Sequence, residues 1–164
     1  MDDKQLAIDI RNAIKEGDLQ KVASLIGSNK DRLTMMAPFG TWMHVAASHG
    51  KLPIVEHLVA LGADINARGG IPGGSPLNEA ASEGHLDIVR YLVSRGAEMD
   101  VSEPERNPLF SAIYGGHTAV AKFLIDSGIN THVKYTGKSM KNMDALAFAR
   151  ERGNREIAAF LEHK

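Results

Sequence analysis

The sequence predicts an all-α solenoid of about five helix-turn-helix units, because three features recur with a period close to 33 residues. The first is a glycine, spaced by 33, 34, 32 and 37 residues, at Gly17, Gly50, Gly84, Gly116 and Gly153. The second is an alanine four positions before each glycine, at Ala13, Ala46, Ala80, Ala112 and Ala149. The third is a leucine eight positions after it, at Leu25, Leu58, Leu92, Leu124 and Leu161.

Each unit is expected to contain two short helices joined at its glycine. A larger apolar residue stands three positions before each alanine and shares its helical stripe, at Ile10, Met43, Leu77, Leu109 and Leu146. The leucine lies in a second apolar run, which predicts a second helix, and Pro53 falls in the first turn of one such helix, where its missing N–H costs little. We expect a left-handed residue to end the second helix at Gly62, Gly96, Gly128 and, in the first unit, Asn29.

Three stretches carry a family resemblance. They read T-W-M-H-V-A-A-S-H-G at 41–50, G-A-D-I-N-A at 62–67 and S-P-L-N-E-A-A-S-E-G-H at 75–85, and they resemble the ankyrin repeat. In that family, the connectors between units form hairpin fingers beside a concave helical face, and insertions there change the recognition surface without changing the core. The resemblance therefore implies a protein-binding module.

The resemblance covers nearly the whole chain and implies a single ankyrin-repeat domain, residues 1–164. Its units lie at about 3–29, 40–66, 74–100, 106–132 and 143–164. The first unit lacks the T-P-L-H pattern of the family, and the last ends in polar residues. Both are therefore expected to be caps, which solenoids need at their ends.

Composition excludes several classes of protein. The chain has no cysteine, which excludes disulfides and cysteine-bound metals and is compatible with a reducing compartment. No stretch approaches the roughly 18 apolar residues of a membrane span, and the acidic first ten residues do not resemble a secretory signal. The 19 basic and 20 acidic side chains are interleaved, so nothing attracts a polyanion. We expect a cytoplasmic protein that binds neither nucleic acid nor membrane.

Two glycine-containing stretches could indicate a phosphate-binding loop. The first, R-G-G-I-P-G-G-S-P at 68–76, lacks the lysine and the preceding buried strand that such a loop needs. The second, Y-T-G-K-S at 135–139, lacks the first glycine, because position 132 is a histidine. We interpret both as fingers, and we expect Ser75 to cap the helix that Pro76 begins.

Metal and nucleophile sites are also not supported. His44, His49 and His57 do not share a helical face and lack acidic companions at ligand spacing; His44 instead occupies a column where the ankyrin ring hydrogen-bonds backbone between units. No strained turn surrounds the Ser82, Glu83 and His85 cluster. We therefore predict no catalytic residue, no bound metal and no cofactor.

The ankyrin pattern implies which residues meet a partner. On the concave face, just before the hinge glycines, these are His49, Glu83, Tyr114 and Arg152. On the fingers they are Ile71, Pro72, Glu103, Arg106, Tyr135, Met140 and Lys141. Trp42 completes the set, but its position allows two interpretations: a packing lid over the first repeat interface or an exposed anchor for the partner.

The stretches at 101–117 and 133–149 are similar to small stand-alone bacterial ankyrin proteins, some of which are immunity proteins that neutralise a toxin. The resemblance implies a folded protein partner, a toxin in this hypothesis, and a chain that is a monomer when free. The alternative is a regulatory adaptor resembling small ankyrin kinase inhibitors, which a cyclin-kinase pull-down would favour. A third, an enzyme without cofactor, would be favoured if Ser82→Ala abolished a turnover.

Overall fold

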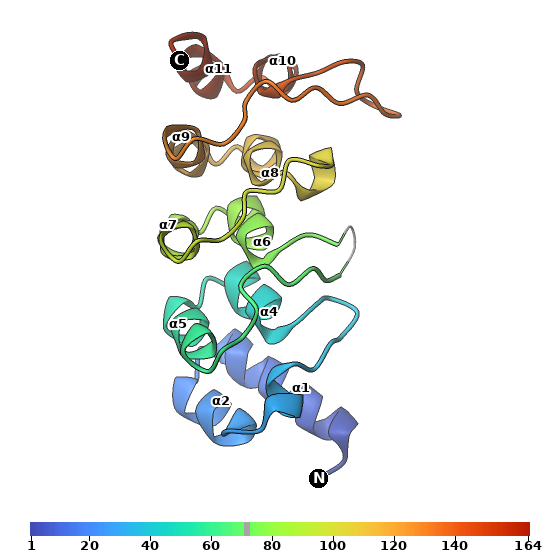
Figure 1. Cartoon of the computed structure of the whole chain (residues 1–164), viewed down its shortest axis with the longest axis vertical. Helices are drawn as coiled ribbons and strands as arrows, with labels where there is room; N and C mark the ends of the chain where they lie inside the picture. The colour runs from blue at the N-terminus through green and yellow to red at the C-terminus, as the bar shows by residue number, and fades with distance from the viewer. Residues whose placement is uncertain (71–72) are drawn as a thin grey trace.

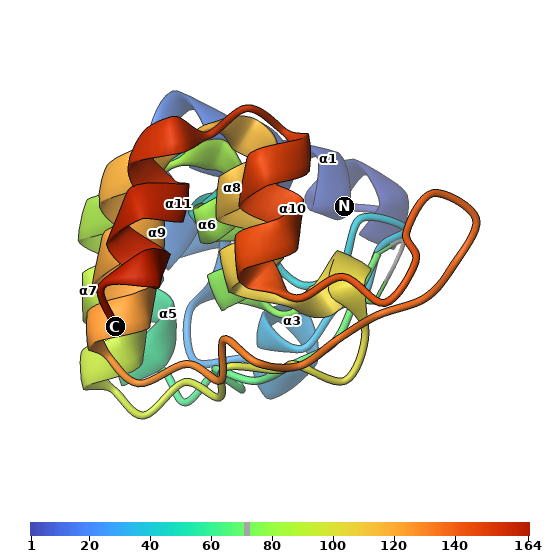
Figure 2. The same ribbon diagram turned by 90° about the horizontal axis from the view of Figure 1, so that it is seen from above.

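The computed structural model describes residues 1–70 and 73–164, which form five helix pairs stacked in chain order (Figure 1). The first helices of the pairs form an inner row, the second helices form an outer row, and loops project from the inner row on the side away from the outer row (Figures 1 and 2). The two termini lie at opposite ends of the stack (Figure 1). The predicted all-α solenoid is therefore confirmed.

The helices of each row pack on the next member of the same row. The inner row consists of α1 (Asp3–Glu16), α4 (Trp42–Ser48), α6 (Pro76–Glu83), α8 (Pro108–Gly115) and α10 (Ala145–Glu151). The outer row consists of α2 (Leu19–Ile26), α5 (Leu52–Ala60), α7 (Leu86–Ser94), α9 (Thr118–Asp126) and α11 (Arg155–Glu162). Two short segments lie outside the rows, namely α3 (Lys30–Leu33) and the 3-10 turn η1 (Pro104–Arg106).

Glycine makes the turn from the inner to the outer helix possible, because it adopts a left-handed backbone without strain. All five hinge glycines have φ between 70° and 78°, and Gly62, Gly96 and Gly128 are also left-handed, as expected. The expectation for Asn29 is wrong. Its φ is −80°, and its side chain accepts hydrogen bonds from the backbone N–H groups of Asp31 and Arg32, so it begins α3.

The core runs through the stack along the predicted columns. The five alanines of the inner helices are fully buried, which lets neighbouring backbones approach closely. In the leucine column, Leu58, Leu92 and Leu124 are fully buried, whereas Leu25 and Leu161 are partly exposed. The difference follows from position, because the end units have a neighbouring unit on one side only.

His44 ties the second unit to the third. Its Nε2–H donates to the carbonyl of Gly74 at 2.9 Å, and its Nδ1 accepts from the backbone N–H of Thr41 at 3.1 Å. Burial lowers the pKa of His44, and its hydrogen bonds to the carbonyls of Gly74 and Ala67 oppose that shift only in part. The ring is thus held neutral, and its expected structural role is confirmed.

Three further side chains make the equivalent link at the start of an outer helix. Each donates a hydrogen bond to a carbonyl near the end of the inner helix of the unit before its own. His85 donates to Ser48 at 2.9 Å, His117 to Ser82 at 2.9 Å and Asn154 to Ile113 at 2.6 Å. These bonds fix the register of each unit on the one before it.

Trp42 packs in the interior, so the structure decides between its two interpretations. The side chain is 2% exposed, and its indole N–H donates to the carbonyl of Arg32 at 2.8 Å, which anchors α3 against α4. Phe39 lies beside it, with ring centroids 6.4 Å apart. Trp42 is a packing lid, and we remove it from the set of surface anchors because its ring is not available to a partner.

The glycine-rich stretch connects two units as predicted. Ser75 Oγ accepts from the backbone N–H of Asn78 at 3.3 Å, and Pro76 begins α6. Gly69 lies against the preceding finger, since a side-chain carbon added there would stand 2.5 Å from the Cα of Gly40. Ile71 and Pro72, predicted to meet the partner, lie outside the described residues.

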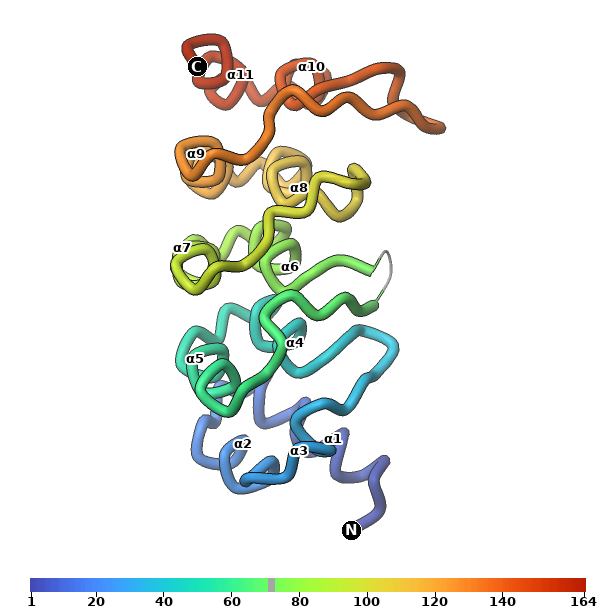
Figure 3. The backbone as a smooth tube through the Cα atoms, in the orientation of Figure 1, coloured from blue at the N-terminus to red at the C-terminus, as the bar shows by residue number. Residues whose placement is uncertain are grey.

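The last two fingers differ in shape (Figures 2 and 3), and they also differ in charge. Residues 100–107, here called the acidic finger, contain three carboxylates and one arginine and are shaped by η1. Residues 133–143, the basic finger, contain three lysines and no carboxylate. Two backbone hydrogen bonds between Tyr135 and Met143, at 2.9 and 3.0 Å, close the basic finger into a hairpin.

Candidate functional site

A groove of about 370 Å³ opens beside α6, α8 and α10, between the helices and the last two fingers. Its walls combine apolar and acidic side chains, including Glu79, Glu105, Phe110, Tyr114, Met140 and Phe148. Elements far apart in the sequence therefore contribute to a single surface. In the described part of the chain, no group of three or more histidine, aspartate or glutamate residues is placed to hold a metal ion.

Aromatic rings form the floor and the rim of the groove. Phe110 stacks on Phe148 with centroids 4.9 Å apart and an angle of 8°, and both rings are mostly buried. Tyr114, one turn after Phe110 on α8, is 66% exposed. The guanidinium of Arg152 lies 4.4 Å from the centroid of the Tyr114 ring. Tyr114 is therefore an exposed aromatic side chain held in place by a cation–π contact.

Tyr135 joins the two fingers and does not face solvent. Its hydroxyl donates to the carbonyl of Val101 at 2.6 Å and accepts from Asn107 Nδ2 at 3.0 Å, and its ring meets the edge of Phe110. The residue is 8% exposed. We correct its expected role, because Tyr135 is largely buried and its hydroxyl links the two fingers.

Two ion pairs involve the acidic finger. Asp100 forms an ion pair with Arg68 of the preceding finger at 2.9 Å, and Arg106 lies 3.7 Å from Glu103. Burial raises the pKa of Asp100, but hydrogen bonds from Ser102 and the charges of Arg68 and Arg106 outweigh it, so the pKa lies below its usual value. Asp100 is therefore ionised, and it links two fingers.

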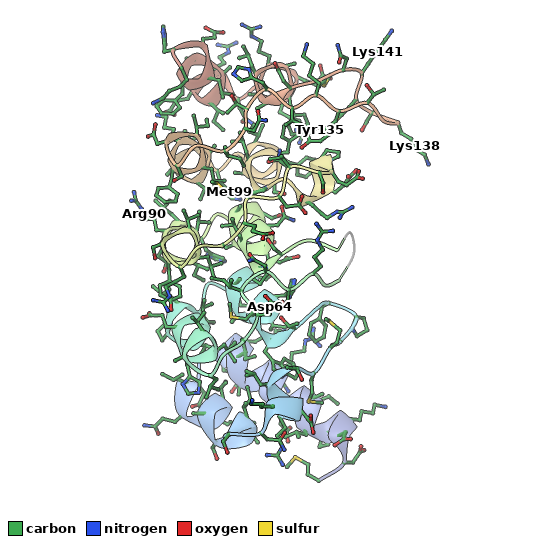
Figure 4. The ribbon with its side chains drawn as sticks, viewed as in Figure 1. Asp64, Arg90, Met99, Tyr135, Lys138 and Lys141 are labelled. Atoms are coloured by element: carbon green, nitrogen blue, oxygen red, sulfur yellow. The ribbon has the colours of Figure 1, made fainter. Side chains whose placement is uncertain are left out.

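The basic finger presents its lysines to solvent. Lys134, Lys138 and Lys141 are exposed, and Lys138 points away from the body of the protein at the tip of the finger (Figure 4). The tip is closed by a hydrogen bond from the N–H of Gly137 to the carbonyl of Met140 at 2.8 Å. Neighbouring fingers thus carry charges of opposite sign on either side of the groove.

A family model described as ankyrin repeats (3 copies) matches residues 10–103, more than half of the chain. The chain belongs to the ankyrin-repeat family. The helix pairs α8–α9 and α10–α11 of this ankyrin protein lie beyond the match, yet they repeat its hinge glycines and buried alanines. A search of curated proteins finds no match to the chain.

Ankyrin repeats are protein–protein interaction modules and are generally non-catalytic. Within the described residues, none of the helices of this ankyrin protein is long and apolar enough to cross a membrane.

Glu79 is the most unusual residue in the groove of this ankyrin protein. It is half-buried on α6, and none of the ion pairs among the described residues involves it. Burial raises the pKa of Glu79, and the negative charge of Glu83, one turn later, raises it further. Burial and the charge of Glu83 thus disfavour the ionised form of this carboxyl, and groups with such shifted pKa values are concentrated at functional sites.

We expect Glu79→Gln to raise the free energy of unfolding by up to about 1 kcal/mol at pH 7, an effect reduced by the partial exposure of the carboxylate. A raised pKa means that the folded state keeps this proton to a higher pH than the unfolded chain. Stability is therefore lost as the pH rises through the titration of Glu79, and the difference between variant and wild type should vanish at acidic pH. Urea denaturation at several pH values measures it.

Glu56→Gln is the matched control for this prediction, because Glu56 is exposed on the outer helix α5. It should leave stability unchanged at each pH. A Glu79→Gln variant that is less stable than wild type at pH 7 would show that the carboxylate contributes favourable contacts.

The predicted surface residues fall into three groups. Tyr114, Met140 and Arg152 meet at the groove, and Glu83 and Lys141 are exposed on α6 and the basic finger beside it. The other predicted residues lie elsewhere: Glu103 and Arg106 pair within the acidic finger, and exposed His49 follows α4, where its ring bonds the carbonyl of Val45.

The sequence-based prediction missed Glu79, Phe110 and Phe148, although a signal for them exists. Each lies one helical turn before a residue of the concave face, since Glu79 precedes Glu83, Phe110 precedes Tyr114 and Phe148 precedes Arg152 by four positions. If the predicted concave face had included the residues one helical turn earlier in each inner helix, all three would have been found. The exposed apolar side chains of the first finger, Met36 and Phe39, were also not predicted as surface residues.

Proposed function

We propose that residues 1–164 act as a single non-catalytic domain that recognises a folded protein partner through its concave face and finger loops. The observation that carries this proposal is Tyr114, which is 66% exposed at the rim of the groove and held there by Arg152. Tyrosine and arginine are enriched among the few residues that dominate binding energy at protein interfaces. An exposed ring at the edge of a groove is suited to anchor a partner.

The charges of the two fingers support recognition of a specific orientation. The acidic finger and the basic finger stand next to each other, so a partner that presents the reverse arrangement would be attracted in one orientation and repelled in the other. Lys138 at the tip of the basic finger is free to act during the encounter (Figure 4). Such charges mainly raise the association rate and reject wrong partners.

Rigid fingers support binding with little change of backbone. Tyr135 connects the two fingers, Arg68 and Asp100 connect the acidic finger to the one before it, and the helix pairs are linked by backbone hydrogen bonds. A surface ordered before binding loses less conformational entropy when the partner docks. We therefore expect the free and bound protein to share the same finger conformation.

For the identity of the partner, we propose a bacterial toxin whose active site is covered by the fingers. The choice rests on the resemblance of the last two fingers to small stand-alone bacterial ankyrin proteins, some of which are immunity proteins, and a monomeric, cytoplasmic protein would suit it. Co-purification from the native host tests the proposal. Recovery of a toxin would support it, and recovery of only metabolic enzymes or signalling kinases would reject it.

Alanine substitution tests the proposed surface directly. Tyr114→Ala and Arg106→Ala should each weaken partner binding by on the order of 1 to 3 kcal/mol while changing the melting temperature little. Both side chains lie on the surface that we assign to the partner, and calorimetric titration measures the loss. Arg95→Ala is the matched control, because Arg95 is exposed at the end of the outer helix α7. A collapse of the melting temperature would mark Tyr114 or Arg106 as structural.

A further inference from the structure

We infer that the groove receives one basic side chain of the protein partner, an arginine, with its guanidinium beside Glu79 and Glu105 and its stem against Phe110, Tyr114 and Met140. This inference rests on the proposed function, since it specifies the chemistry that the partner brings to the same surface. It follows from the carboxylates and the aromatic rings that line the same groove.

The acidic wall lacks a compensating cation. Glu79 belongs to α6 and Glu105 to the acidic finger, and both line the groove, with Glu83 one turn beyond Glu79. Among the described residues, neither Glu79 nor Glu105 takes part in an ion pair. Of the arginines nearby, Arg106 follows Glu105 but pairs with Glu103 at 3.7 Å, and Arg152 stacks on Tyr114. A partner that supplies a positive charge would therefore neutralise carboxylates that the free protein leaves uncompensated.

The apolar lining of the groove suits the stem of an arginine. Phe110, Tyr114, Phe148 and Met140 present ring and thioether surface to the groove. One face of the Tyr114 ring already carries a guanidinium, that of Arg152 at 4.4 Å, so rings and guanidinium groups are compatible at this site. Arginine is favoured over lysine because its planar group stacks on rings and binds carboxylates with two parallel hydrogen bonds.

The size of the groove limits the occupant. Its volume of about 370 Å³ is near the lower end of the range of roughly 300 to 1,000 Å³ for ligand pockets. That volume suits a single long side chain and is too small for a partner helix. An acidic side chain would meet Glu79 and Glu105 as like charges, which disfavours the charged form of all three.

An arginine of the partner would also account for the position of Glu79, whose ionised form is disfavoured by burial and by Glu83. Natural proteins keep unfavourable groups where function needs them, at a cost in stability. A bound guanidinium would favour the ionised form of Glu79 and lower its pKa, so binding should release protons in the pH range where the free carboxyl titrates. The charge that acts on that carboxyl is Glu83 on α6; Glu105 of the acidic finger lines the same groove, and Arg152, directly after α10, contacts Tyr114 at the rim.

Nuclear magnetic resonance titration of the full chain tests the inference with a defined probe. N-acetyl-arginine amide should shift the signals of Glu79, Tyr114 and Met140 and lower the pKa of Glu79. The neutral isostere N-acetyl-citrulline amide should bind about tenfold more weakly, because it lacks the charge that strengthens hydrogen bonds to carboxylates. Glu79→Gln should weaken arginine binding by a similar factor, and Glu56→Gln should leave it unchanged.

Three outcomes would overturn the inference: no binding of the arginine derivative, equal binding of the citrulline derivative, or equal binding to Glu79→Gln and wild type. The titration requires no partner, so its failure is distinct from a failure of the proposed function. If the arginine derivative fails to bind but Tyr114→Ala still weakens binding of the protein partner, the inference that the groove receives an arginine is wrong and the proposed function stands.

Discussion

Replacement of Trp42 by alanine is expected to lower the free energy of unfolding by about 3 to 5 kcal/mol, as for other large buried aromatic residues. The ring is 2% exposed, and its N–H holds the carbonyl of Arg32, so the substitution leaves both a cavity and an unsatisfied carbonyl. Because α3 is attached to α4 through this contact, the first finger should also loosen. Chemical denaturation followed by circular dichroism measures the loss.

Trp42→Phe separates the two contributions to this loss. Phenylalanine keeps much of the apolar volume but cannot donate to the carbonyl of Arg32, so we expect a smaller decrease, on the order of 1 to 3 kcal/mol. A Trp42→Ala variant that loses less than about 1 kcal/mol would fall in the range of surface substitutions. That result would support the interpretation of Trp42 as an exposed anchor and contradict its burial.

Replacement of Leu92 by alanine is expected to lower the free energy of unfolding by about 2 to 5 kcal/mol. Leu92 is fully buried on α7, which packs between the outer helices α5 and α9, so the cavity lies in the middle of the stack. Leu161→Ala provides the matched control. It occupies the same column in the last unit but is partly exposed, and it should lose clearly less. A loss near zero for Leu92→Ala would contradict the stacking of the outer helices.

The helix pairs could be predicted from the sequence because their causes are local. Three residue types recur at fixed positions of the repeat, each for a local reason. The glycine makes the turn, the alanine allows close approach of helices, and the leucine fills the space between units, as at Gly84, Ala80 and Leu92. The error at Asn29 has a local cause too. Asparagine both tolerates the left-handed backbone and caps helices, and the sequence does not decide between these roles.

The fingers could be predicted less well because their contacts are long-range. The hydroxyl of Tyr135 donates a hydrogen bond to the carbonyl of Val101, 34 residues earlier, and no recurring position of the repeat predicts that contact. Tyr135 therefore has the appearance of a finger residue in the sequence and the burial of a core residue in the structure. The sequence left the burial of Trp42 undecided because its hydrogen-bond partner, Arg32, belongs to α3, an element that the repeat does not contain.

The candidate site was predicted in part because the residues of the concave face recur at fixed positions of the repeat, just before the hinge glycines. Tyr114 lies two residues before Gly116 and Arg152 lies one residue before Gly153, and the structure brings the two side chains into contact. Glu79 was missed because the prediction was confined to the two residues before each hinge glycine. The raised pKa of Glu79 is caused first by its burial, in a groove that is lined by residues from several elements and not by α6 alone.

The central claim is that the concave face, and not the outer row, holds the partner. Photo-crosslinking in the native host tests it most directly, with p-azidophenylalanine replacing Tyr114 on α8 in one variant and Tyr91 on the outer helix α7 in another. Both substitutions exchange one para-substituted ring for another, so each serves as the control for the other. We expect position 114 to crosslink to a single protein partner and position 91 to give no such product. Crosslinking of that partner from position 91 but not from position 114 would contradict the claim.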